Sequence, residues 1–381
     1  MFPHSGGISS HISSLKKELE RRGYGVDVLS LSSLSLLGLL LVRAPSALLN
    51  RIDRGLGYIY RYPALCFFLG IWSFFGSIFR RYELIHCHDV VAYSSTLPAR
   101  KLLHMPIVLT LHGYLKNEAL SQKEAKPYYA PVFDFFESLA KNAPVQLAAD
   151  TRIRDYLVNE VEVRPSNVRA YRNFVDASLF ELPKAGKEEA RSVFKLPKDK
   201  KIIFCPRRLV VKNGVINAIR AMAYLPKGFL LAIAGIGPEE QNLRAEAKGK
   251  EVVFLGAVPN ERISQLYRAA DYTVIPSVTV SNVEEATSIS AIESMASGTP
   301  VIASGIGGLR ELITDGKDGI LVPQADPKMI AKAILKLEKD TAAAAKIIAS
   351  AKEKVKKELS SEFVVGEFIT LDYSRAVKGA K

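Results

Sequence analysis

Cysteine is scarce in this sequence. Its 381 residues include three, Cys66, Cys87 and Cys205, which lie far apart. An odd, sparse set argues against a disulfide framework and indicates a reducing compartment. The first ten residues, MFPHSGGISS, also lack the charged and apolar segments of a secretory signal. We therefore expect a cytoplasmic protein whose three thiols behave as small buried hydrophobic groups.

Acidic residues are also in short supply. Asp and Glu number 39 against 52 Lys and Arg, which leaves a net charge of +13. This balance favours an anionic partner: nucleic acid, a membrane surface or a phosphorylated ligand. The sequence has no long Lys/Arg tract and no aromatic-basic stripe of the kind that binds single strands. We therefore expect no nucleic-acid partner.

One uncharged run is long. Residues 62–79, YPALCFFLGIWSFFGSIF, carry no charge and have arginine on both sides. The run reaches the lower length limit of a spanning helix, although a proline and two glycines weaken a simple helix. Three alternatives stay open: a spanning helix, an apolar face in a bilayer interface, and ordinary core. Six arginines against one acid between residues 31 and 82 favour the interface, on the inner face of the membrane.

Short β-rich runs alternate with helical stretches along the chain. They are YGVDVLSL, LIHCHD, PIVLTLH and PVQLAA in the first half, and KIIFCP, LLAIAG, VVFLG, YTVIPS, PVIAS and GILVP in the second. This alternation predicts an α/β fold of two Rossmann-like domains facing a cleft, with ligands outside the carboxyl ends of the strands. A polar stretch at 180–201 separates the two sets, so the predicted domains are 1–178 and 179–360.

The chain opens directly on a glycine turn, HSGGISSH, followed by an amphipathic helix. In a Rossmann-like domain such a turn follows the first strand, which is central to the sheet. That first strand is missing from the sequence. We expect that Met1 is an internal methionine of a longer protein; the alternative is a domain without this central strand.

Two glutamates, Glu285 and Glu293, stand on either side of a predicted helix start. The strand before them ends at Ser277, and Thr287 and Ser288 occupy the start, where they can cap backbone N–H groups. A helix start also binds anions. A carboxylate accepts two hydrogen bonds side by side, which suits vicinal hydroxyls of a sugar or ribose. The pair therefore suits a sugar nucleotide; the alternative is a solvated helix face with two ordinary glutamates.

Positive charge follows another strand end. CPRRLVVKNGV places Arg207 or Arg208, together with Lys212, at the carboxyl end of a strand and ahead of a glycine and a helix. Arginine offers a planar fork and lysine a point charge, both of which suit phosphate oxygens. The alternative is a solvated basic turn.

Three further strand ends or turns contain candidate ligand-binding residues. LTLHGY places His112 at the end of a buried strand, and HSGG supplies Gly6 and Gly7, which let a ligand approach the backbone closely. The histidines of IHCHD share one face of a strand, but a metal site would need further ligands, so we expect no metal. Asp89, at the end of that strand, is the expected acceptor-side residue.

Taken together, these motifs resemble glycosyltransferase family 4, whose fold is GT-B. The resemblance covers nearly the whole chain and is strongest over residues 201–323. The family's motifs appear here as HSGGISSH, LIHCHD, TLHG, NFVD, RRLVVKNG, GIGP, FLGAVP, the E-x7-E pair, MASGTPVIAS and GGLRELI. No piece is decisive, but their order and spacing together are highly specific.

The resemblance implies roles for these residues. Glu293 would hold the donor's ribose and Glu285 the hydroxyls of its sugar, while Arg208 and Lys212 would stabilise the diphosphate leaving group. Amides around the helix start would help with the same charge; they belong to Thr287, Ser288 and Ile289. Preorganised cations and dipoles there lower the barrier, because departure of a nucleoside diphosphate builds negative charge.

The resemblance also covers the rest of the chain. His112 would lie near the transferred sugar, and Gly6 and Gly7 would shape the site from the first domain. Residues 361–381 look like the family's last helix, which crosses back onto that domain. The family retains anomeric configuration and generally needs no metal, so we expect no cofactor.

The sequence departs from the family pattern at two places in its second half. Thr287 and Ser288 replace the Phe and Gly of the family's E-x-F-G, which puts the identity of the sugar in doubt. The arginine-to-lysine spacing is one residue short, so Asn213 could occupy the usual lysine position. The missing first strand is a third departure.

The sequence thus predicts a retaining glycosyltransferase that moves a hexose from a UDP- or GDP-sugar to a glycan or lipid-linked acceptor at the membrane surface. The alternatives are a non-catalytic sugar-nucleotide-binding protein of the same fold and a soluble disaccharide or polysaccharide synthase. A nicotinamide-dependent oxidoreductase is disfavoured, because the glycines of GIGP lack the third glycine of the dinucleotide fingerprint.

Overall fold

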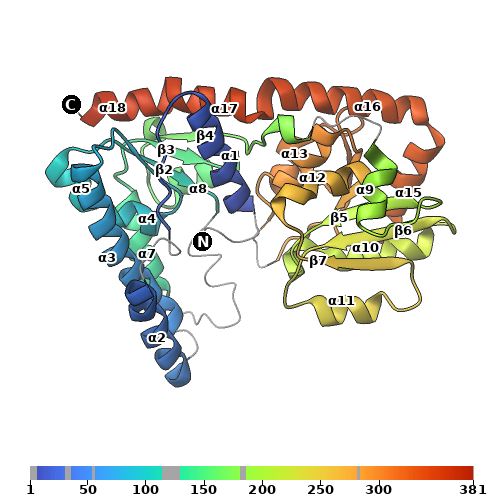
Figure 1. The fold of residues 1–381 in the computed structure, drawn as a ribbon, viewed down its shortest axis with the longest axis horizontal. Helices are drawn as coiled ribbons and strands as arrows, with labels where there is room; N and C mark the ends of the chain where they lie inside the picture. Colours follow the sequence, from blue (N-terminus) through green and yellow to red (C-terminus); the bar gives the residue numbers. More distant parts are fainter. Residues whose placement is uncertain are drawn as a thin grey trace. The chain divides into compact units, whose positions relative to one another are not determined.

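A computed structural model describes residues 7–30, 36–53, 56–113, 129–180, 186–280 and 284–380. The chain forms two compact units (Figure 1). The first unit consists mainly of Leu19–Tyr171 and Val365–Lys381. The second consists of Ser5–Glu18 and Arg172–Val364. The domain boundaries expected from sequence stay a prediction.

The second unit contains a six-stranded parallel sheet with the order β10-β9-β8-β5-β6-β7. Its strands are β5 (Lys201–Pro206), β6 (Phe229–Ala234), β7 (Val252–Gly256), β8 (Tyr272–Ile275), β9 (Val301–Ser304) and β10 (Ile320–Val322). All six were predicted from the sequence and are confirmed. Strand order reverses between β5 and β8, and ligands of doubly wound sheets bind at such a switch point.

Helices cover both faces of this sheet. They are α9 (Lys187–Val193), α10 (Val215–Ala221), α11 (Glu240–Glu246), α12 (Asn260–Ala269), α13 (Ile289–Ser297), α14 (Gly307–Leu312), α15 (Pro327–Lys339) and α16 (Thr341–Lys354). Helices α1 (Gly7–Arg21) and α17 (Ser361–Glu367) each contain residues of both units. Two apolar clusters result, one including side chains of α12, α13 and α14, the other of α10 and α15. Because strands buried on both faces read as continuous apolar runs, these strands were easy to recognise.

The first unit contains a four-stranded parallel sheet with the order β1-β2-β3-β4. The strands are β1 (Ile85–Cys87), β2 (Ile107–Leu111), β3 (Gln146–Ala148) and β4 (Val168–Ala170). Its helices are α2 (Leu36–Ile52), α3 (Leu56–Phe79), α4 (Val90–Ser95), α5 (Leu97–Leu103), α7 (Ala130–Ala140), α8 (Thr151–Asn159) and α18 (Ser374–Ala380). Strand β4 is short and was not predicted.

The strand predicted at YGVDVLSL is wrong over its described residues, 24–30, which form no strand. A β-strand exists only with a hydrogen-bonded neighbour. No strand among the described residues pairs with residues 24–30. Local β-propensity was therefore overridden by the lack of a partner in the described chain.

The C-terminal residues pack within the first unit. Phe368 is fully buried, and its ring meets that of Tyr171 edge to face, with centroids 5.1 Å apart. Arg169 Nη2 lies 2.5 Å from Asp372 Oδ2. Residues 368–373 are π-helical and continue α17 into α18, in agreement with the predicted final helix. Both an aromatic contact and an ion pair therefore hold this segment.

Helix α3 contains the long uncharged run. It extends over 24 residues with Pro63 inside, and its part Ile59–Phe79 is long and apolar enough to cross a membrane by length and composition. Only 17% of its most apolar window is buried. The alternative of an ordinary core helix therefore does not hold.

Glycines bring the loops at the carboxyl edge of the second sheet together. Gly214 has φ +60°, and a Cβ there would lie 1.9 Å from the carbonyl oxygen of Pro276, next to β8. A Cβ on Gly308 would lie 2.6 Å from the Thr287 nitrogen. The turns after β5 and before α13 and α14 can therefore approach one another only through glycine.

We expect Gly214→Ala to destabilise the second unit by about 3 kcal/mol or more, because it adds a backbone clash to the strain of a positive φ. Gly228→Ala is the matched control: φ is +104° there, but nothing lies within 4 Å of the added Cβ. Its expected cost is about 1 kcal/mol. Urea unfolding measures both; equal losses would show that the close approach to Pro276 is unimportant.

Candidate functional site

The candidate site lies at the carboxyl ends of β5 and β8, on either side of the switch point. Arg207 directly follows β5, and Ser277 lies two residues after β8. Glu285 lies in the loop before α13, which begins at Ile289, and Glu293 lies in the second turn of that helix. The predicted placement of both glutamates around a helix start is confirmed.

Arg207 is the hub of the site. Its side chain is 7% exposed. Its Nη2 donates to Glu285 Oε2 at 2.7 Å, Asn213 Oδ1 at 2.7 Å and Ser277 Oγ at 2.9 Å. Its Nη1 donates to Ser288 Oγ at 3.3 Å. The guanidinium thus joins the ends of two strands to the start of α13.

Arg208 lies elsewhere. Its side chain is exposed, and its carbonyl oxygen accepts from Asn213 Nδ2 at 2.8 Å. Lys212 is half-buried in a short 3₁₀ turn, Val211–Asn213. From the sequence, either Arg207 or Arg208 could contact phosphate oxygens, and the family resemblance favoured Arg208. The roles of Arg208 and Lys212 towards a diphosphate stay predictions.

Glu285 is held in its ionised form. Burial alone would raise the pKa of this carboxyl, but the charge and hydrogen bond of Arg207, the charge of Lys212 and a hydrogen bond from Ser277 outweigh it. The net effect lowers the pKa of Glu285 below its usual value. A fixed carboxylate that accepts hydrogen bonds is therefore available at the strand ends.

The start of α13 is built without a side-chain cap. Ser288 occupies the N-cap position but makes no capping hydrogen bond, since its hydroxyl accepts from Arg207 instead. The carbonyl of Thr287 accepts from Asn173 Nδ2 at 2.8 Å, and that of Glu285 accepts from the Gly308 N–H at 2.8 Å. The loop is therefore fixed from both sides, and the expected capping role of Ser288 is not seen in α13.

The pKa of Glu293 is shifted in the opposite direction to that of Glu285. It is buried in α13, and its Oε2 lies 2.8 Å from the hydroxyl of Tyr267, which is fully buried on α12. Burial raises the pKa of Glu293 to about 7, although the hydrogen bond from Tyr267 works in the other direction. Sequence reasoning missed Tyr267, because a tyrosine on the apolar side of a helix looks like ordinary core.

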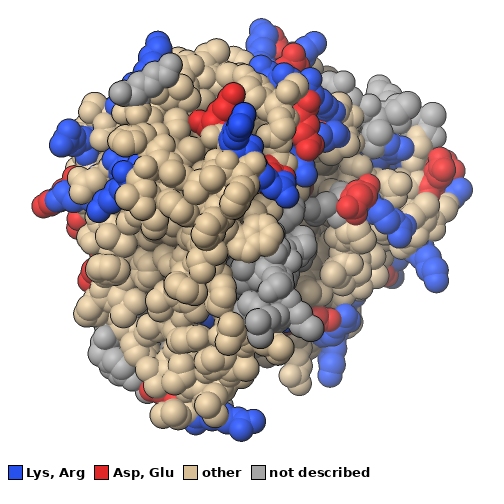
Figure 2. Space-filling view, turned by 60° about the vertical axis from the view of Figure 1, so that its left-hand side comes forward, with Lys and Arg blue, Asp and Glu red and all other residues tan. Residues whose placement is uncertain are grey.

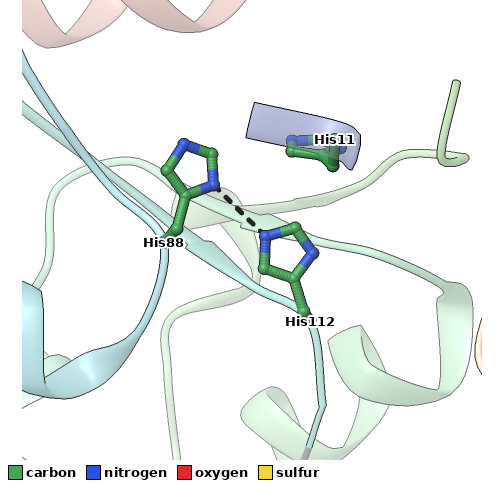
Figure 3. Close-up of side chains that lie close together, drawn as sticks. All are labelled: His11, His88 and His112. Carbon is green, nitrogen blue, oxygen red and sulfur yellow. Dashed lines mark hydrogen bonds between the residues drawn. The ribbon is translucent and has the colours of Figure 1, made fainter. Parts of the chain in front are cut away.

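The first unit contributes a separate group of histidines (Figure 3). His88 Nδ1 and His112 Nε2 lie 3.2 Å apart, with the rings stacked. Both ring nitrogens of His86 are engaged, one by Thr110 Oγ1 at 2.7 Å and one by Tyr373 Oη at 2.8 Å. Burial lowers the pKa of His112 to about 4, so the ring is neutral at pH 7.

The remaining predicted residues have local structural roles or lie outside the described residues. Asp89 caps α4, where its side chain accepts from the Ala92 N–H at 2.6 Å. Gly7 is the first residue of α1, and Gly6 lies outside the described residues. Their roles towards donor and acceptor stay predictions.

The three cysteines are free thiols, as expected. Cys87 and Cys205 are buried and Cys66 is partly buried. Burial raises the pKa of each thiol to about 12. None of them is therefore a thiolate near neutral pH.

Comparison with known proteins gives two family matches. The model described as Glycosyltransferase Family 4 matches residues 5–179, and the model described as Glycosyl transferases group 1 matches residues 186–354. A D-inositol 3-phosphate glycosyltransferase of Acidothermus cellulolyticus is 27% identical over 360 residues, 87% of this chain and 78% of that protein. An uncharacterized glycosyltransferase of Methanocaldococcus jannaschii is 27% identical over 76% of this chain and 75% of its own length.

Solved structures share the fold. HepE of Anabaena, in a crystal structure with UDP and glucose, has a TM-score of 0.71 at 18% identity, with 97% of each chain covered. Sucrose-phosphate synthase of Thermosynechococcus elongatus has a TM-score of 0.68 at 24% identity, covering 84% of this chain and 79% of its own. The fold is therefore GT-B, with two Rossmann-like α/β units.

Glu293 makes stability depend on pH. The native pKa, about 7, lies above the usual value of 4.5. The unfolded chain therefore loses this proton first as pH rises, and the native state loses stability between about pH 4.5 and 7. We expect Glu293→Gln to remove this loss, so that its stability relative to wild type grows across that window by roughly 2–4 kcal/mol.

Thermal unfolding from pH 4 to pH 8 measures this difference, read as a growing Tm advantage of the variant. Glu246→Gln is the control, because Glu246 lies near the surface and its pKa is lowered by Arg220. A constant Tm difference between Glu293→Gln and wild type would contradict the raised pKa.

Proposed function

Because this chain belongs to the glycosyl transferases of group 1 and family 4, we propose that it is a retaining, metal-independent glycosyltransferase that uses a nucleotide-sugar donor. The observation that carries the proposal is the pair Glu285 and Glu293 around the start of α13, at the switch point of the second sheet. A sugar nucleotide offers two sets of vicinal hydroxyls joined by a diphosphate. Two carboxylates separated by a helix start complement that pattern.

The comparisons support a uridine nucleotide as the first donor to test. The HepE structures contain UDP-glucose, UDP, or UDP with glucose. Relatives over most of this chain are D-inositol 3-phosphate glycosyltransferases. We therefore take UDP-glucose as the leading donor and GDP-sugars as the alternative.

The second unit supplies the charges that this reaction needs. Breaking the bond between sugar and diphosphate leaves negative charge on the nucleotide. Arg208 and Lys212, near the end of β5, are the cations proposed for that charge, and the N-terminus of α13 adds its dipole. Glu285 is the proposed acceptor of hydroxyls of the transferred sugar, and Glu293 of the ribose hydroxyls.

We expect UDP and UDP-glucose to raise the Tm of the protein, since ligands that bind the native state stabilise it. Glu293→Ala should abolish the shift by both, because it removes the ribose contact. Arg208→Ala should keep most of the shift but slow sugar transfer about a hundredfold, since it acts on the leaving group.

The measurement is a thermal-shift panel of UDP, GDP, ADP and their sugar conjugates, followed by donor hydrolysis. Arg220→Ala is the control, because Arg220 forms an exposed pair with Glu246 in the same unit. A nucleotide shift without transfer or hydrolysis would favour a non-catalytic binding protein. A panel without any shift would overturn the proposal.

We also propose that the acceptor lies at a membrane surface, where α2 and α3 dock. Large apolar side chains are exposed along α3, and include Phe67, Ile71, Trp72, Phe75 and Phe79. Figure 2 shows this side of the molecule as a broad face with few charged residues and with Lys, Arg and some Asp or Glu at its edges. Apolar faces of this size on soluble monomers are rare.

The charges around this face favour a bilayer with anionic lipids as its occupant. Arg43, Arg51, Arg80 and Arg81 are exposed on or beside α2 and α3. An apolar helix face flanked by arginine is typical of interfacial binding, where apolar burial and attraction to anionic headgroups add. An apolar contact with a protein partner would not by itself account for this excess of positive charge.

A cavity beside α3 fits an acceptor with an apolar chain. Its volume is about 390 Å³, and its lining includes Ile71, Trp72 and Phe75. At its polar edge, Arg80 Nη1 lies 2.7 Å from Asp27 Oδ2. We propose that this cavity receives part of a lipid-linked acceptor.

Phe67→Glu should reduce binding to phosphatidylcholine–phosphatidylglycerol vesicles about tenfold, because it places a carboxylate in the apolar face. Phe135→Glu on α7 is a matched control. Phe67 is 63% exposed and packs edge to face on Phe68, and Phe135 is 58% exposed and packs in the same way on Phe136.

Vesicle sedimentation at low and high salt measures this binding. Salt should weaken it, since it screens the arginines. Equal losses in the two variants, or no binding to vesicles by the wild type, would rule out this docking face.

A further inference from the structure

Arg207 has a burial and a set of contacts that a solvated basic turn would not have. Its guanidinium contacts Glu285, Asn213, Ser277 and Ser288. Its Nε is buried with no hydrogen-bond partner among the described residues. A buried guanidinium is costly unless it is paired, so this arrangement depends on the Glu285 carboxylate.

The contacts of Arg207 restrain Glu285 directly. Arg207 Nη2 and Ser277 Oγ both donate to the same carboxylate oxygen, Glu285 Oε2, at 2.7 and 3.4 Å. The arginine is in turn fixed by Asn213, whose own amide donates to the Arg208 carbonyl. The carboxylate therefore cannot rotate away without breaking contacts at the ends of both β5 and β8.

Two departures from the family pattern meet here. The usual lysine position after the strand is held by Asn213, six residues after Arg207. In E-x-F-G the glycine position is held by Ser288. The structure brings all three together: Arg207 donates to Asn213 Oδ1 at 2.7 Å and to Ser288 Oγ at 3.3 Å.

We propose that Arg207 is a positioning residue that holds the Glu285 carboxylate ionised and oriented towards the sugar of the donor. It supplies the fixed buried cation next to Asn213, and it acts on the reaction through Glu285. The inference rests on the proposed function, because it requires Glu285 to bind donor hydroxyls. The ion pair itself can be tested without any donor.

The donor-independent test is a double-mutant cycle on stability. Arg207→Met leaves Glu285 buried without its partner and should lower the Tm by about 10 °C. Glu285→Gln alone leaves the guanidinium without a counter-charge and should also lower it. The double variant, Arg207→Met with Glu285→Gln, removes both charges and should recover most of the loss.

The control for the cycle is Arg220→Met with Glu246→Gln, an exposed pair that should show little coupling. Additive losses at Arg207 and Glu285 would show that the two are not energetically coupled and would overturn the proposal. This outcome does not depend on whether a donor has been identified.

The functional test compares UDP with UDP-glucose. We expect Arg207→Met to weaken UDP-glucose binding about tenfold while UDP binding stays within about twofold of wild type, because only the sugar contacts pass through Glu285. Loss of both affinities together would indicate a general structural defect and contradict the positioning role. If neither ligand binds the wild type, the proposed function fails. The stability cycle still shows whether Arg207 and Glu285 are energetically coupled.

The pH profile provides a readout that a purely structural role would not change. Activity should require ionised Glu285, so kcat/KM falls at low pH as this group takes up a proton. Removing the arginine leaves burial as the dominant effect on its pKa. The acid limb should therefore move to higher pH in Arg207→Met.

Arg207→Lys tests the positive charge of Arg207 separately from the planar geometry of its guanidinium. Lysine keeps the positive charge, so the acid limb should stay near that of the wild type. It cannot bridge Glu285 and Ser288 as a planar fork, so UDP-glucose affinity should fall to an intermediate value. An unchanged acid limb in Arg207→Met would show that the arginine does not set the ionisation of Glu285.

Discussion

The candidate site depends on one buried ion pair, Arg207 with Glu285, formed where two neighbouring strands end. Charges in the interior are stable only when they are paired and hydrogen-bonded. The surrounding turns supply what the pair needs: Asn213 and Ser277 from the strand ends, and Ser288 from the start of α13. The same contacts fix the loop that carries Glu285, so local stability and the geometry of the site have one origin.

The two glutamates of the site differ because their neighbours differ. Glu285 faces a guanidinium and a nearby lysine, which lower its pKa, whereas Glu293 is buried beside the hydroxyl of Tyr267 and burial raises its pKa. A carboxylate with a lowered pKa and one whose pKa is raised to about 7 thus lie on either side of one helix start. Environment, rather than residue type, divides their chemistry.

The first unit combines a short sheet with an exposed apolar helix. Its four strands are each five residues or shorter, and the C-terminal residues complete its packing through Phe368 and Asp372. Helix α3 packs through some of its apolar side chains, such as Leu56 and Ile59, but leaves others, including Phe67, Trp72 and Phe79, exposed. Apolar surface that the fold does not bury is available for a partner, and the surrounding arginines favour an anionic lipid surface.

The sequence by itself determined the second unit almost completely. Strands buried on both faces read as continuous apolar runs, and all six strands of its sheet were recognised in this way. It also located Glu285 and Glu293 around a helix start. The sequence did not determine which distant segments of the chain lie next to one another. The run at 24–30 has β-propensity but forms no strand, because propensity is local while a strand needs a neighbour.

Tertiary structure likewise decided which arginine is buried against Glu285. Arg207 and Arg208 are adjacent and chemically identical, yet one is buried on Glu285 and the other exposed. Successive residues at a strand end point in opposite directions, and spacing does not reveal which side a partner occupies. The partner here is 78 residues further along the chain. Only the order of the strands in the sheet, which places β8 beside β5, brings it within reach.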